Sequence, residues 1–439
     1  MAGDREDATG RVLVSKQVDG LLSDGPGDAE SRLLNLMQER CYRFFCEAAD
    51  GVSGLIPDRA PLKDSGNGKI ADRYRVASSA SCGFGLAAYA VGMQNGWESP
   101  EDAGRRCERL LRTLVDKVQH ERGFLYHFVD RRTGRRSWRS EASSIDTALA
   151  AAGAMVAGSV FGGRIAELAD QLIDRIDWQW MLNGSDTLSM GWTPEDGFLS
   201  SRWDRYSELM VMLLIAIGAR RSPIDPACWY AWNRSETLHC NGQPFVTYAP
   251  LFVHQYSHAF FDFRRWVLPD DFDPWQNSVL AHRAHIEYLK GLGQRYPDRF
   301  GHYDQSLWGV TSSDSASGYR DWGGPYRDGC FEPARGMDGT VVPSAAAGAL
   351  PMVPKLALQT LRHQFEMYGY AIFGRYGFTN AFNPATGWIG PDVVGIDTGI
   401  SLLMAENLMR ESVWDAFMKH PVAKNAIDRL GFTPRAETA

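Results

Sequence analysis

The stretch ASSASCGFGLAAYAVGM at residues 77–93 is small or apolar on every side, and SPEDAGRRCERLLRTLVDKV follows it at residues 99–118. The first stretch has no polar stripe, which predicts a helix that is buried all round. The second begins with Ser, Pro, Glu and Asp, which are a cap, a first-turn proline and early acids, and then spaces its apolar residues as an amphipathic helix does. A buried inner helix followed by an amphipathic outer helix is therefore the predicted unit of the fold.

The same pairing recurs along the chain. Further helical patterns cover residues 29–49, 143–158, 163–182, 205–219, 272–292, 343–350, 352–373, 396–410 and 412–430. Inner helices rich in small residues that alternate with charged outer helices are what a double ring of helices requires, because inner helices touch neighbours on every side. We therefore predict an all-α fold, an (α/α)6 barrel, formed as one domain over residues 29–433. Residues 1–28 are polar and lack a period, which predicts a flexible N-terminal tail.

Short β-hairpins are expected in the loops between these helices. Residues 123–138 read GFLYHFVDRRTGRRSW and place Thr133 and Gly134 between two aromatic-rich runs. A Gly-containing turn between such runs is typical of a hairpin.

The composition narrows the class of protein. The chain has 439 residues, of which 53 are acidic and 46 basic, and the net charge of −7 argues against a nucleic-acid partner. No stretch approaches the ~20 apolar residues of a membrane span. The N-terminus lacks the basic start and apolar run of a signal peptide, so we expect a cytoplasmic protein, with a periplasmic or secreted form whose signal has been removed as the alternative. Seven cysteines without a C-x-x-C pair are expected to be mostly reduced. The sequence leaves the oligomeric state open.

Aromatic residues make up 12% of the chain and include fourteen tryptophans, several of them in segments rich in Gly, Pro and Asp. The flat apolar faces of sugars stack on such rings. The pattern favours an oligosaccharide or polysaccharide ligand, and packing at helix–loop junctions is the alternative for any single tryptophan.

Two short motifs resemble a dinucleotide-binding site and a metal-binding site, but the residues around them do not support either function. Gly83, Gly85 and Ala88 imitate a dinucleotide fingerprint, but the residues before them are small and suit a helix rather than the strand that this motif needs. His254 and His258 have the i, i+4 spacing of a metal-binding helix, but Gln255 stands where a zinc protease needs glutamate. We interpret the two histidines as hydrogen-bonded or substrate-contacting groups, and we predict no metal and no cofactor.

The stronger signal is a set of carboxylates at the starts of apolar inner helices. Glu141 and Asp146 flank the start of ASSIDTALAAAGA, Glu208 lies in WDRYSELMVMLLIAIG, and Asp397 lies in GPDVVGIDTGISLLMAEN. One such residue could simply interact with the helix dipole. Several together are expected to converge on one cleft, because the ends of the inner helices of a barrel meet there. A carboxyl group against apolar neighbours has a raised pKa and can donate a proton near neutral pH.

Glycosidic cleavage needs one acid that protonates the leaving oxygen and one carboxylate that acts as base or nucleophile. Glu208 fits the acid, because it follows Trp203 and Tyr206 and runs directly into an apolar stretch. Asp397 is the favoured partner, because Gly395 and Gly399 would let the backbone and a substrate approach closely. Asp146 is the alternative partner.

The order of these segments resembles the bacterial glucoamylase-like family, whose members include β-1,2-glucan hydrolases and related transglycosylating domains. The matching pieces span residues 30–433 and are GLIPDR (54–59), ASSASCGFGLAAYAVG (77–92), GFLYHFVDRRTG (123–134), SSIDTALAAAG (143–153), YSELMVMLLIAIG (206–218), LFVHQYSHAFFDFR (251–264), MDGTVVPSAAAGALPMVP (337–354) and GIDTGISLLMAENLMRESVWDAFMKHP (395–421).

The resemblance implies an (α/α)6 fold, no required metal, and hydrolysis of β-glucan by an acid and base pair with inversion, in which Glu208 is the acid. Thr398 and Asp146 depart from the family pattern, which leaves the linkage, and hydrolysis as against transfer, open. The expected substrate-binding residues are Asp58, Arg59, Trp203, Tyr206, His254, Tyr256, His258 and Asp338. The alternatives are a transglycosylase, a non-catalytic carbohydrate-binding protein, and a sugar epimerase or lyase that would use His254, Tyr256, His258 and Arg264.

Overall fold

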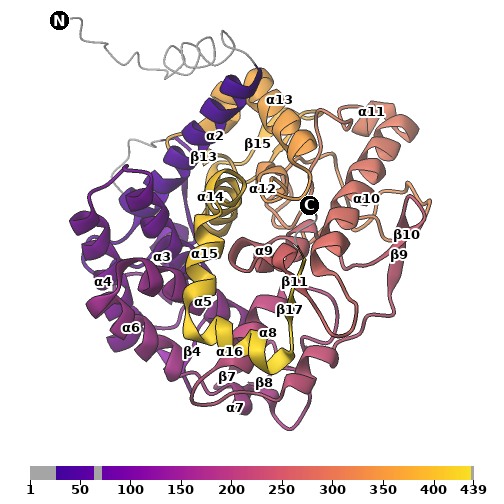
Figure 1. Ribbon diagram of the computed structural model, residues 1–439. Coiled ribbons are helices and arrows are strands. Elements are labelled where there is room, and N and C mark those ends of the chain that lie inside the picture. The colour runs from indigo at the N-terminus through magenta and orange to yellow at the C-terminus, as the bar shows by residue number, and fades with distance from the viewer. Residues whose placement is uncertain (1–25, 64–71, 437–439) are drawn as a thin grey trace, which may run out of the picture.

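The structure is a computed structural model that describes residues 26–63 and 72–436 (Figure 1). Residues 1–25 of the predicted tail lie outside the described residues. Helix α2 (Pro26–Arg43) begins before the predicted start at residue 29, and a π-helical turn (Phe44–Ala48) continues it. The predicted helix over 29–49 is thus present and extends further toward the N-terminus.

Among the described residues, the most buried helices lie in the inner part of the fold (Figure 1). They are α3 (Ser79–Gln94), α5 (Ser144–Phe161), α8 (Leu209–Gly218), α9 (Tyr256–Phe260), α12 (Pro343–Ala347) and α14 (Gly395–Arg410). Helix α3 packs between α5 and α14, α5 packs on α8, α8 on α9, and α12 on α14. The Gln255 side-chain amide donates to the carbonyl of Ala345 and joins the start of α9 to α12. The prediction that residues 77–93 form a helix buried all round is confirmed.

Glycine is what allows α3 and α5 to pack so closely. A Cβ atom on Gly83 would lie 2.2 Å from the carbonyl oxygen of Leu149, and one on Gly153 would lie 1.9 Å from the carbonyl oxygen of Gly83. Both separations are far below van der Waals contact, so any side chain here would force the helices apart. The small residues that revealed the inner helices are therefore required by their packing.

The outer helices are more polar and flank the inner ones (Figure 1). They are α2, α4 (Pro100–Asp116), α6 (Gly163–Asp174), α10 (Pro274–Arg295) and α13 (Pro354–Ile372), with the short α11 (Pro297–Phe300) after α10. Ser99 caps α4 through its hydroxyl, as its sequence predicts. The chain is helix-rich, as the all-α prediction requires.

Two predicted helices are each divided in two. The segment 163–182 forms α6 and α7 (Trp178–Leu182), and Asp177 caps the second piece by accepting a hydrogen bond from the Trp180 amide. The segment 412–430 forms α15 (Ser412–Lys419) and α16 (Pro421–Leu430), and the break falls at His420 before the proline. Proline lacks an amide hydrogen and starts a new helix more readily than it continues one.

Short antiparallel ribbons connect the helices. The pairs are β1 (Arg59–Pro61) with β16 (Asp392–Val394), β2 (Val76–Ser78) with β5 (Phe128–Asp130), β3 (His120–Glu121) with β4 (Phe124–Leu125), β9 (Thr237–Cys240) with β10 (Gln243–Val246), β11 (Trp266–Val267) with β17 (Thr433–Pro434), β12 (Phe373–Gly374) with β13 (Gly377–Phe378), and β14 (Phe382–Asn383) with β15 (Trp388–Ile389). Strands β6 (Ala142–Ser143), β7 (Gly191–Thr193) and β8 (Gly197–Phe198) form one three-stranded sheet. The predicted turn at Thr133 and Gly134 is present, because the Gly134 amide donates to the Asp130 carbonyl at 2.8 Å and Val129 bridges Arg136.

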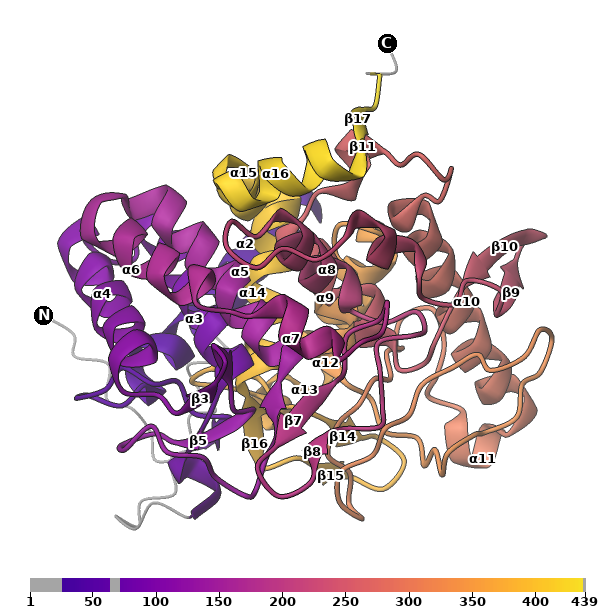
Figure 2. The same cartoon turned by 90° about the horizontal axis from the view of Figure 1, so that it is seen from below.

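The ribbons determine which end of the inner helices is open to a ligand. Strands β2, β6 and β16 run directly into α3, α5 and α14, so the ribbons that contain these strands lie at the N-terminal ends of these inner helices. Helices α15 and α16 lie across the opposite end (Figure 2). Ser78 and Ser143 cap α3 and α5 at the ribbon end.

Helix α5 is long and apolar enough to cross a membrane when it is judged by length and composition alone. In the fold, 78% of it is buried inside the molecule, as befits a core helix.

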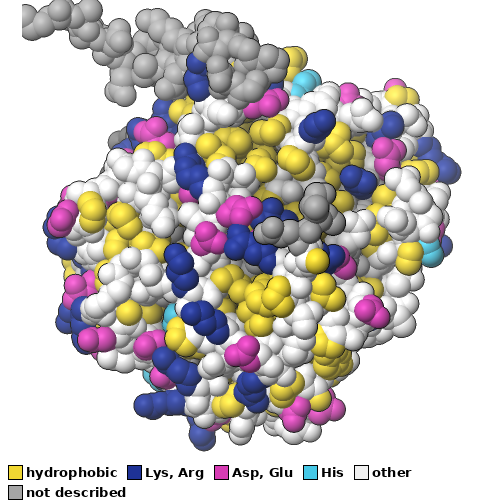
Figure 3. Space-filling view, in the orientation of Figure 1, with side chains coloured by type: hydrophobic (Ala, Val, Ile, Leu, Met, Phe, Trp, Pro, Cys, Tyr) yellow, Lys and Arg dark blue, Asp and Glu magenta, His cyan; other side chains and the backbone are white. Residues whose placement is uncertain are grey.

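Basic and acidic side chains are interspersed on the face shown in Figure 3. All seven cysteines are free, and five of them are buried.

Candidate active site

A cavity of about 480 Å³ lies at the N-terminal ends of the inner helices. Every inner helix, or the residue that precedes it, supplies a lining side chain, and these are Ala80 for α3, Asp146 for α5, Glu208 for α8, Tyr256 for α9, Ser344 for α12 and Asp397 for α14. The predicted convergence of the inner-helix ends on one cleft is therefore what the structure shows. Four of the predicted substrate-binding or catalytic carboxylates, Asp58, Asp146, Glu208 and Asp397, lie along this one cavity.

Glu208 immediately precedes α8 and is only 8% exposed. Its side chain makes no capping hydrogen bond, and within the described part of the chain no other side chain donates a hydrogen bond to its carboxyl group. The pKa of Glu208 is raised to about 7, chiefly by burial, and the negative charges of Asp146 and Asp321 act in the same direction. A carboxyl group in this environment keeps its proton near neutral pH and has it available for transfer.

A second cavity of about 330 Å³ adjoins the first at Glu208. Glu208 and Phe252 line both cavities, and Trp203, Tyr206 and Asp321 line the second one. The Glu208 carboxyl group therefore has space for a ligand on either side of it.

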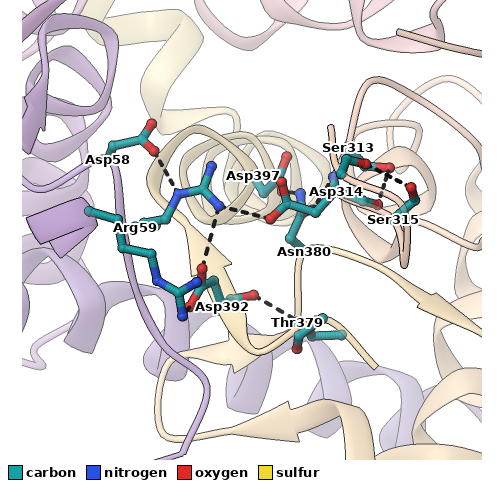
Figure 4. A network of polar contacts seen from close by, with 12 residues as sticks. Asp58, Arg59, Ser313, Asp314, Ser315, Thr379, Asn380, Asp392 and Asp397 are labelled. Atoms are coloured by element: carbon teal, nitrogen blue, oxygen red, sulfur yellow. Dashed lines mark hydrogen bonds and ion pairs between the residues drawn. The ribbon is translucent and has the colours of Figure 1, made fainter. Parts of the chain in front are cut away.

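Asp397 lies in the first turn of α14 and is held by two neutral donors (Figure 4). Ser344 Oγ donates to its Oδ1 at 3.0 Å, and Asn380 Nδ2 donates to its Oδ2 at 2.6 Å. Burial raises the pKa of Asp397 to about 7, although both hydrogen bonds act in the opposite direction. The orientation of this carboxyl group is thus fixed while its proton affinity stays high.

The glycines around Asp397 fulfil one part of their predicted role, the close approach of neighbouring chain, and not the other. A Cβ atom on Gly395 would lie 2.4 Å from Ser81 Oγ, and one on Gly399 would lie 2.3 Å from the Phe84 ring. Both glycines therefore let α14 pack against α3. The expectation that they admit a substrate is wrong, because the space beside them is filled by α3.

Arg59 gathers three carboxylates beside Asp397 (Figure 4). Its Nε lies 2.9 Å from Asp58 Oδ2, and its Nη1 lies 2.8 Å from Asp314 Oδ2 and 3.4 Å from Asp392 Oδ2. The Asp314 amide in turn donates to Asn380 Oδ1 at 2.8 Å, and Asn380 also holds Asp397. The predicted residues Asp58 and Arg59 both line the cavity, and Arg59 fixes the acidic wall next to Asp397.

His127 joins the two remaining predicted carboxylates. Its Nδ1 lies 3.0 Å from Glu141 Oε1 and its Nε2 lies 3.5 Å from Asp146 Oδ1, and Ser143 Oγ donates to the other oxygen of Asp146 at 2.6 Å. Burial disfavours a charged ring, but Asp146 and Glu141 together raise the pKa of His127 to about 9. Glu141 does not line the cavity and contacts it only through His127.

His127, Glu141 and Asp146 are also the group of described residues best placed to hold a metal ion, since one donor atom from each lies within 4.8 Å of the others. Both ring nitrogens of His127 face carboxylates, however, and a protonated ring has no lone pair for a metal. An ion-paired imidazolium therefore accounts for the cluster.

The two predicted histidines lie in the core and not on the cavity. His254 is stacked on Tyr206 with ring centroids 4.4 Å apart, and its Nε2 lies 3.0 Å from Thr247 Oγ1. His258 Nε2 lies 2.8 Å from Ser278 Oγ, and burial lowers the pKa of His258 to about 3. This placement agrees with the interpretation of the two histidines as hydrogen-bonded groups. It contradicts the prediction that they contact the substrate.

The other predicted binding residues are divided between two places. Tyr256 lines the first cavity, whereas Trp203 and Tyr206 line the second. Asp338 lines neither cavity, because its Oδ1 accepts hydrogen bonds from the amide and hydroxyl of Thr340 within a turn.

Several lining residues were not predicted from the sequence, and they are Gln255, His127, Asp314, Trp138, Tyr319, Ser344 and Asn380. Asp314 and Tyr319 come from the irregular segment between α11 and α12, which has no period that would mark its inward side. The sequence does indicate His127 as a candidate site residue, since it is the one side chain in the aromatic run GFLYHFV that can become charged near neutral pH.

The sequence pattern of one protein family, described as "Putative glucoamylase", matches residues 200–421, just over half of the chain. The chain belongs to this family. The match includes both Glu208 and Asp397.

Relatives of this glucoamylase-like chain extend the likeness over nearly its whole length. An exo β-1,2-glucooligosaccharide sophorohydrolase of Parabacteroides distasonis is 24% identical over 446 residues, which cover 91% of this chain; the chain spans 58% of the length of that relative. The solved endo-β-1,2-glucanase of Chitinophaga pinensis matches with a TM-score of 0.80 and 23% identity, covering 92% of this chain and 98% of that one. The solved β-1,2-glucanase of P. distasonis matches with a TM-score of 0.81 and 22% identity, covering 91% and 60%.

Proposed function

We propose that this chain is a glycoside hydrolase that cleaves β-1,2-glucan or its oligosaccharides by general acid and base catalysis. The observation that carries the proposal is the pair of cavity-lining carboxyl groups, Glu208 and Asp397, each with a pKa raised to about 7 by burial. We further propose that the fold is an (α/α)6 barrel formed as one domain over residues 29–433. The six buried helices whose N-terminal ends share one cavity support this assignment.

Glu208 is the proposed general acid. Its protonated carboxyl group has cavity space on both sides, which a group that protonates the oxygen between two sugar units needs. Among the described residues, no side chain forms a hydrogen bond with the Glu208 carboxyl group, so its proton is available for the substrate. As the glycosidic bond breaks, the proton moves from Glu208 to the departing oxygen and leaves a carboxylate behind.

Asp397 is the proposed base, which takes a proton from the attacking water either directly or through a substrate hydroxyl. Its two partners, Ser344 and Asn380, are neutral, so they orient the carboxylate without neutralising its charge. Burial also raises the pKa of the alternative, Asp146, but this carboxyl group faces the cationic ring of His127, which acts in the opposite direction. Asp58 and Tyr256 are proposed to bind substrate hydroxyls from the same cavity.

The β-1,2 linkage rests on the relatives, since the curated one is named for β-1,2-glucooligosaccharides and two of the solved ones for β-1,2-glucan. The decisive assay measures reducing-end release from linear and cyclic β-1,2-glucans beside β-1,3-, β-1,4- and α-linked glucans. We expect products from the β-1,2 substrates. Absence of product from every glucan would refute the proposal, and a disaccharide donor that yields longer chains would identify a transglycosylase instead.

The epimerase or lyase alternative loses most of its support. Two of its proposed proton carriers, His254 and His258, are buried in the core. Arg264 is engaged by Asp262 and Glu411 outside the cavity, with Nη2 to Oε1 of Glu411 at 2.6 Å. Only Tyr256 of that group lines the cavity, and burial raises its pKa well above the ordinary value, so its phenol stays protonated and cannot accept a proton near neutral pH.

A further inference from the structure

Two consecutive non-glycine residues at the rim of the cavity have an unfavourable backbone conformation. Trp138 and Arg139 each have φ of +54°, in the left-handed region that side chains rarely adopt. Trp138 lines the first cavity and is 58% exposed, and Tyr319 of the same cavity is 64% exposed. A large ring held outward by a strained backbone is a feature that calls for a function.

The surrounding chain holds Trp138 in this position. The Ser137 amide donates to the Phe128 carbonyl at 2.9 Å, and Arg136 donates to the carbonyls of Arg139 and Ser140. Arg136 is itself fixed by Glu195, at 2.7 Å between Nη1 and Oε1. These bonds on both sides of Trp138 compensate for the backbone strain and keep the loop in one conformation.

The indole ring of Trp138 also packs against neighbouring aromatic rings. It packs edge-on against Phe128 with centroids 5.0 Å apart, and Phe128 is stacked on His127 at 3.9 Å. Phe128 and His127 thus connect the indole ring of Trp138 to the ion cluster of Glu141, His127 and Asp146. More than half of the surface of Trp138 remains exposed. A rigid aromatic surface of this kind loses little conformational freedom when a flat ligand covers it.

We propose that Trp138, together with Tyr319, is a saccharide-binding platform that stacks on a glucosyl ring beyond the two units joined at the scissile bond. The inference rests on the proposed function. All ring substituents of a β-glucosyl unit are equatorial, which leaves a flat face of C–H groups that suits an indole. Trp138 lines the cavity that contains Asp397 and not the one that contains Trp203, so the platform binds the chain on the Asp397 side of Glu208.

The test compares kcat/KM on β-1,2-glucooligosaccharides of increasing length for the wild type, Trp138→Ala and Trp138→Phe. We expect Trp138→Ala to lose about tenfold on the longest chains and clearly less on the shortest chain that is cleaved, with partial recovery in Trp138→Phe. Tyr230→Ala is the matched control, because Tyr230 is 43% exposed and lines neither cavity. Equal losses at every length, or no loss, would overturn the proposal and leave the proposed hydrolase intact.

A binding measurement supplies a readout that a merely structural role of Trp138 would not change. In a Glu208→Gln background labelled with 5-fluorotryptophan, the ¹⁹F signal that Trp138→Phe removes belongs to Trp138. We expect this signal to shift when a long oligosaccharide binds, and the Kd from calorimetry to rise about tenfold in Trp138→Ala. An unmoved signal with bound ligand would refute the stacking. If the wild type neither binds nor cleaves any β-1,2-glucan, the proposed function fails and the platform fails with it.

Discussion

Replacement of Glu208 by glutamine is expected to lower activity and raise stability at the same time. Glutamine has the shape of glutamate but cannot give a proton to the leaving oxygen. Since a positioned general acid contributes about 10²- to 10⁴-fold, the variant should lose kcat by that factor. A substrate with a leaving group that needs no proton, such as an aryl glycoside, should lose much less.

The gain in stability follows from the burial of the carboxyl group. The rise of the Glu208 pKa from 4.5 to about 7 corresponds to about 3 kcal/mol. Because the folded state holds the proton more tightly than the unfolded one, the wild type loses this stability as the pH rises from 4.5 through 7. Glutamine cannot ionise. The free energy of unfolding of the variant, relative to that of the wild type, should therefore be about 3 kcal/mol higher at pH 8 than at pH 4. For a chain of this length that is a rise in Tm of about 3 to 4 °C.

Glu406→Gln is the matched control, because Glu406 is also a buried glutamate and lies within the inner helix α14. Its carboxylate accepts hydrogen bonds from Gln38, Asn95, Ser412 and Arg410, at 2.7 to 3.1 Å. Its replacement should therefore lower Tm while the activity of each folded molecule remains. Thermal unfolding and turnover of both variants at pH 4 and pH 8 check the argument. A Glu208→Gln protein that keeps activity within about tenfold on the natural substrate, or that melts earlier than the wild type at pH 8, would refute it.

Three further predictions concern protons at the same site. The profile of kcat/KM should be a narrow bell near pH 7 that falls about tenfold per pH unit on each side, since Glu208 must be protonated and Asp397 ionised while both pKa values lie near 7; a plateau from pH 5 to 9 would contradict this. His127→Ala should lower Tm more at pH 6 than at pH 10, because the raised pKa of about 9 makes the stabilising charge of His127 present below 6.5 and lost as the pH passes 9, whereas the packing of the ring on Phe128 does not depend on pH. Proton NMR of the first products should show the α anomer if a β-glucan is cleaved with inversion, and β anomer first would show retention.

The helices could be predicted from the sequence because their signals are local. The all-round apolar stretch at 77–93 and the Ser-Pro-Glu-Asp start at 99 each contain the packing face or the cap that the structure then shows. Helix α10 shows the limit of this approach. Its pattern reads as amphipathic, but His282 and His285 are buried. His285 is hydrogen-bonded to the carbonyl of Gly324 and His282 to the side chain of Gln255, so their burial depends on neighbours far away in the sequence.

The candidate site could be predicted only in part, for a similar reason. Glu208 was identified because the apolar stretch that follows it in the sequence predicts a buried helix, and the structure shows Glu208 buried at the start of that helix. Asp314 became visible only in the structure, because its importance comes from Arg59, 255 positions away in the sequence. His254 was assigned to the substrate because spacing along a helix cannot show which side of the helix faces a cavity.

The carboxyl groups at the inner-helix ends illustrate which of two opposing effects decides the chemistry. The positive end of a helix dipole favours an ionised carboxylate by about 0.3 to 1 kcal/mol, which would lower the pKa of Glu208 before α8 and of Asp397 in the first turn of α14. Burial acts in the opposite direction and raises both pKa values to about 7, an effect of about 3 kcal/mol or more for each group. Desolvation therefore outweighs the dipole, and it arises from the apolar inner helices themselves. The close packing of small residues such as Gly83 and Gly153 brings the inner helices together, and their burial of Glu208 and Asp397 is what lets these carboxyl groups keep their protons.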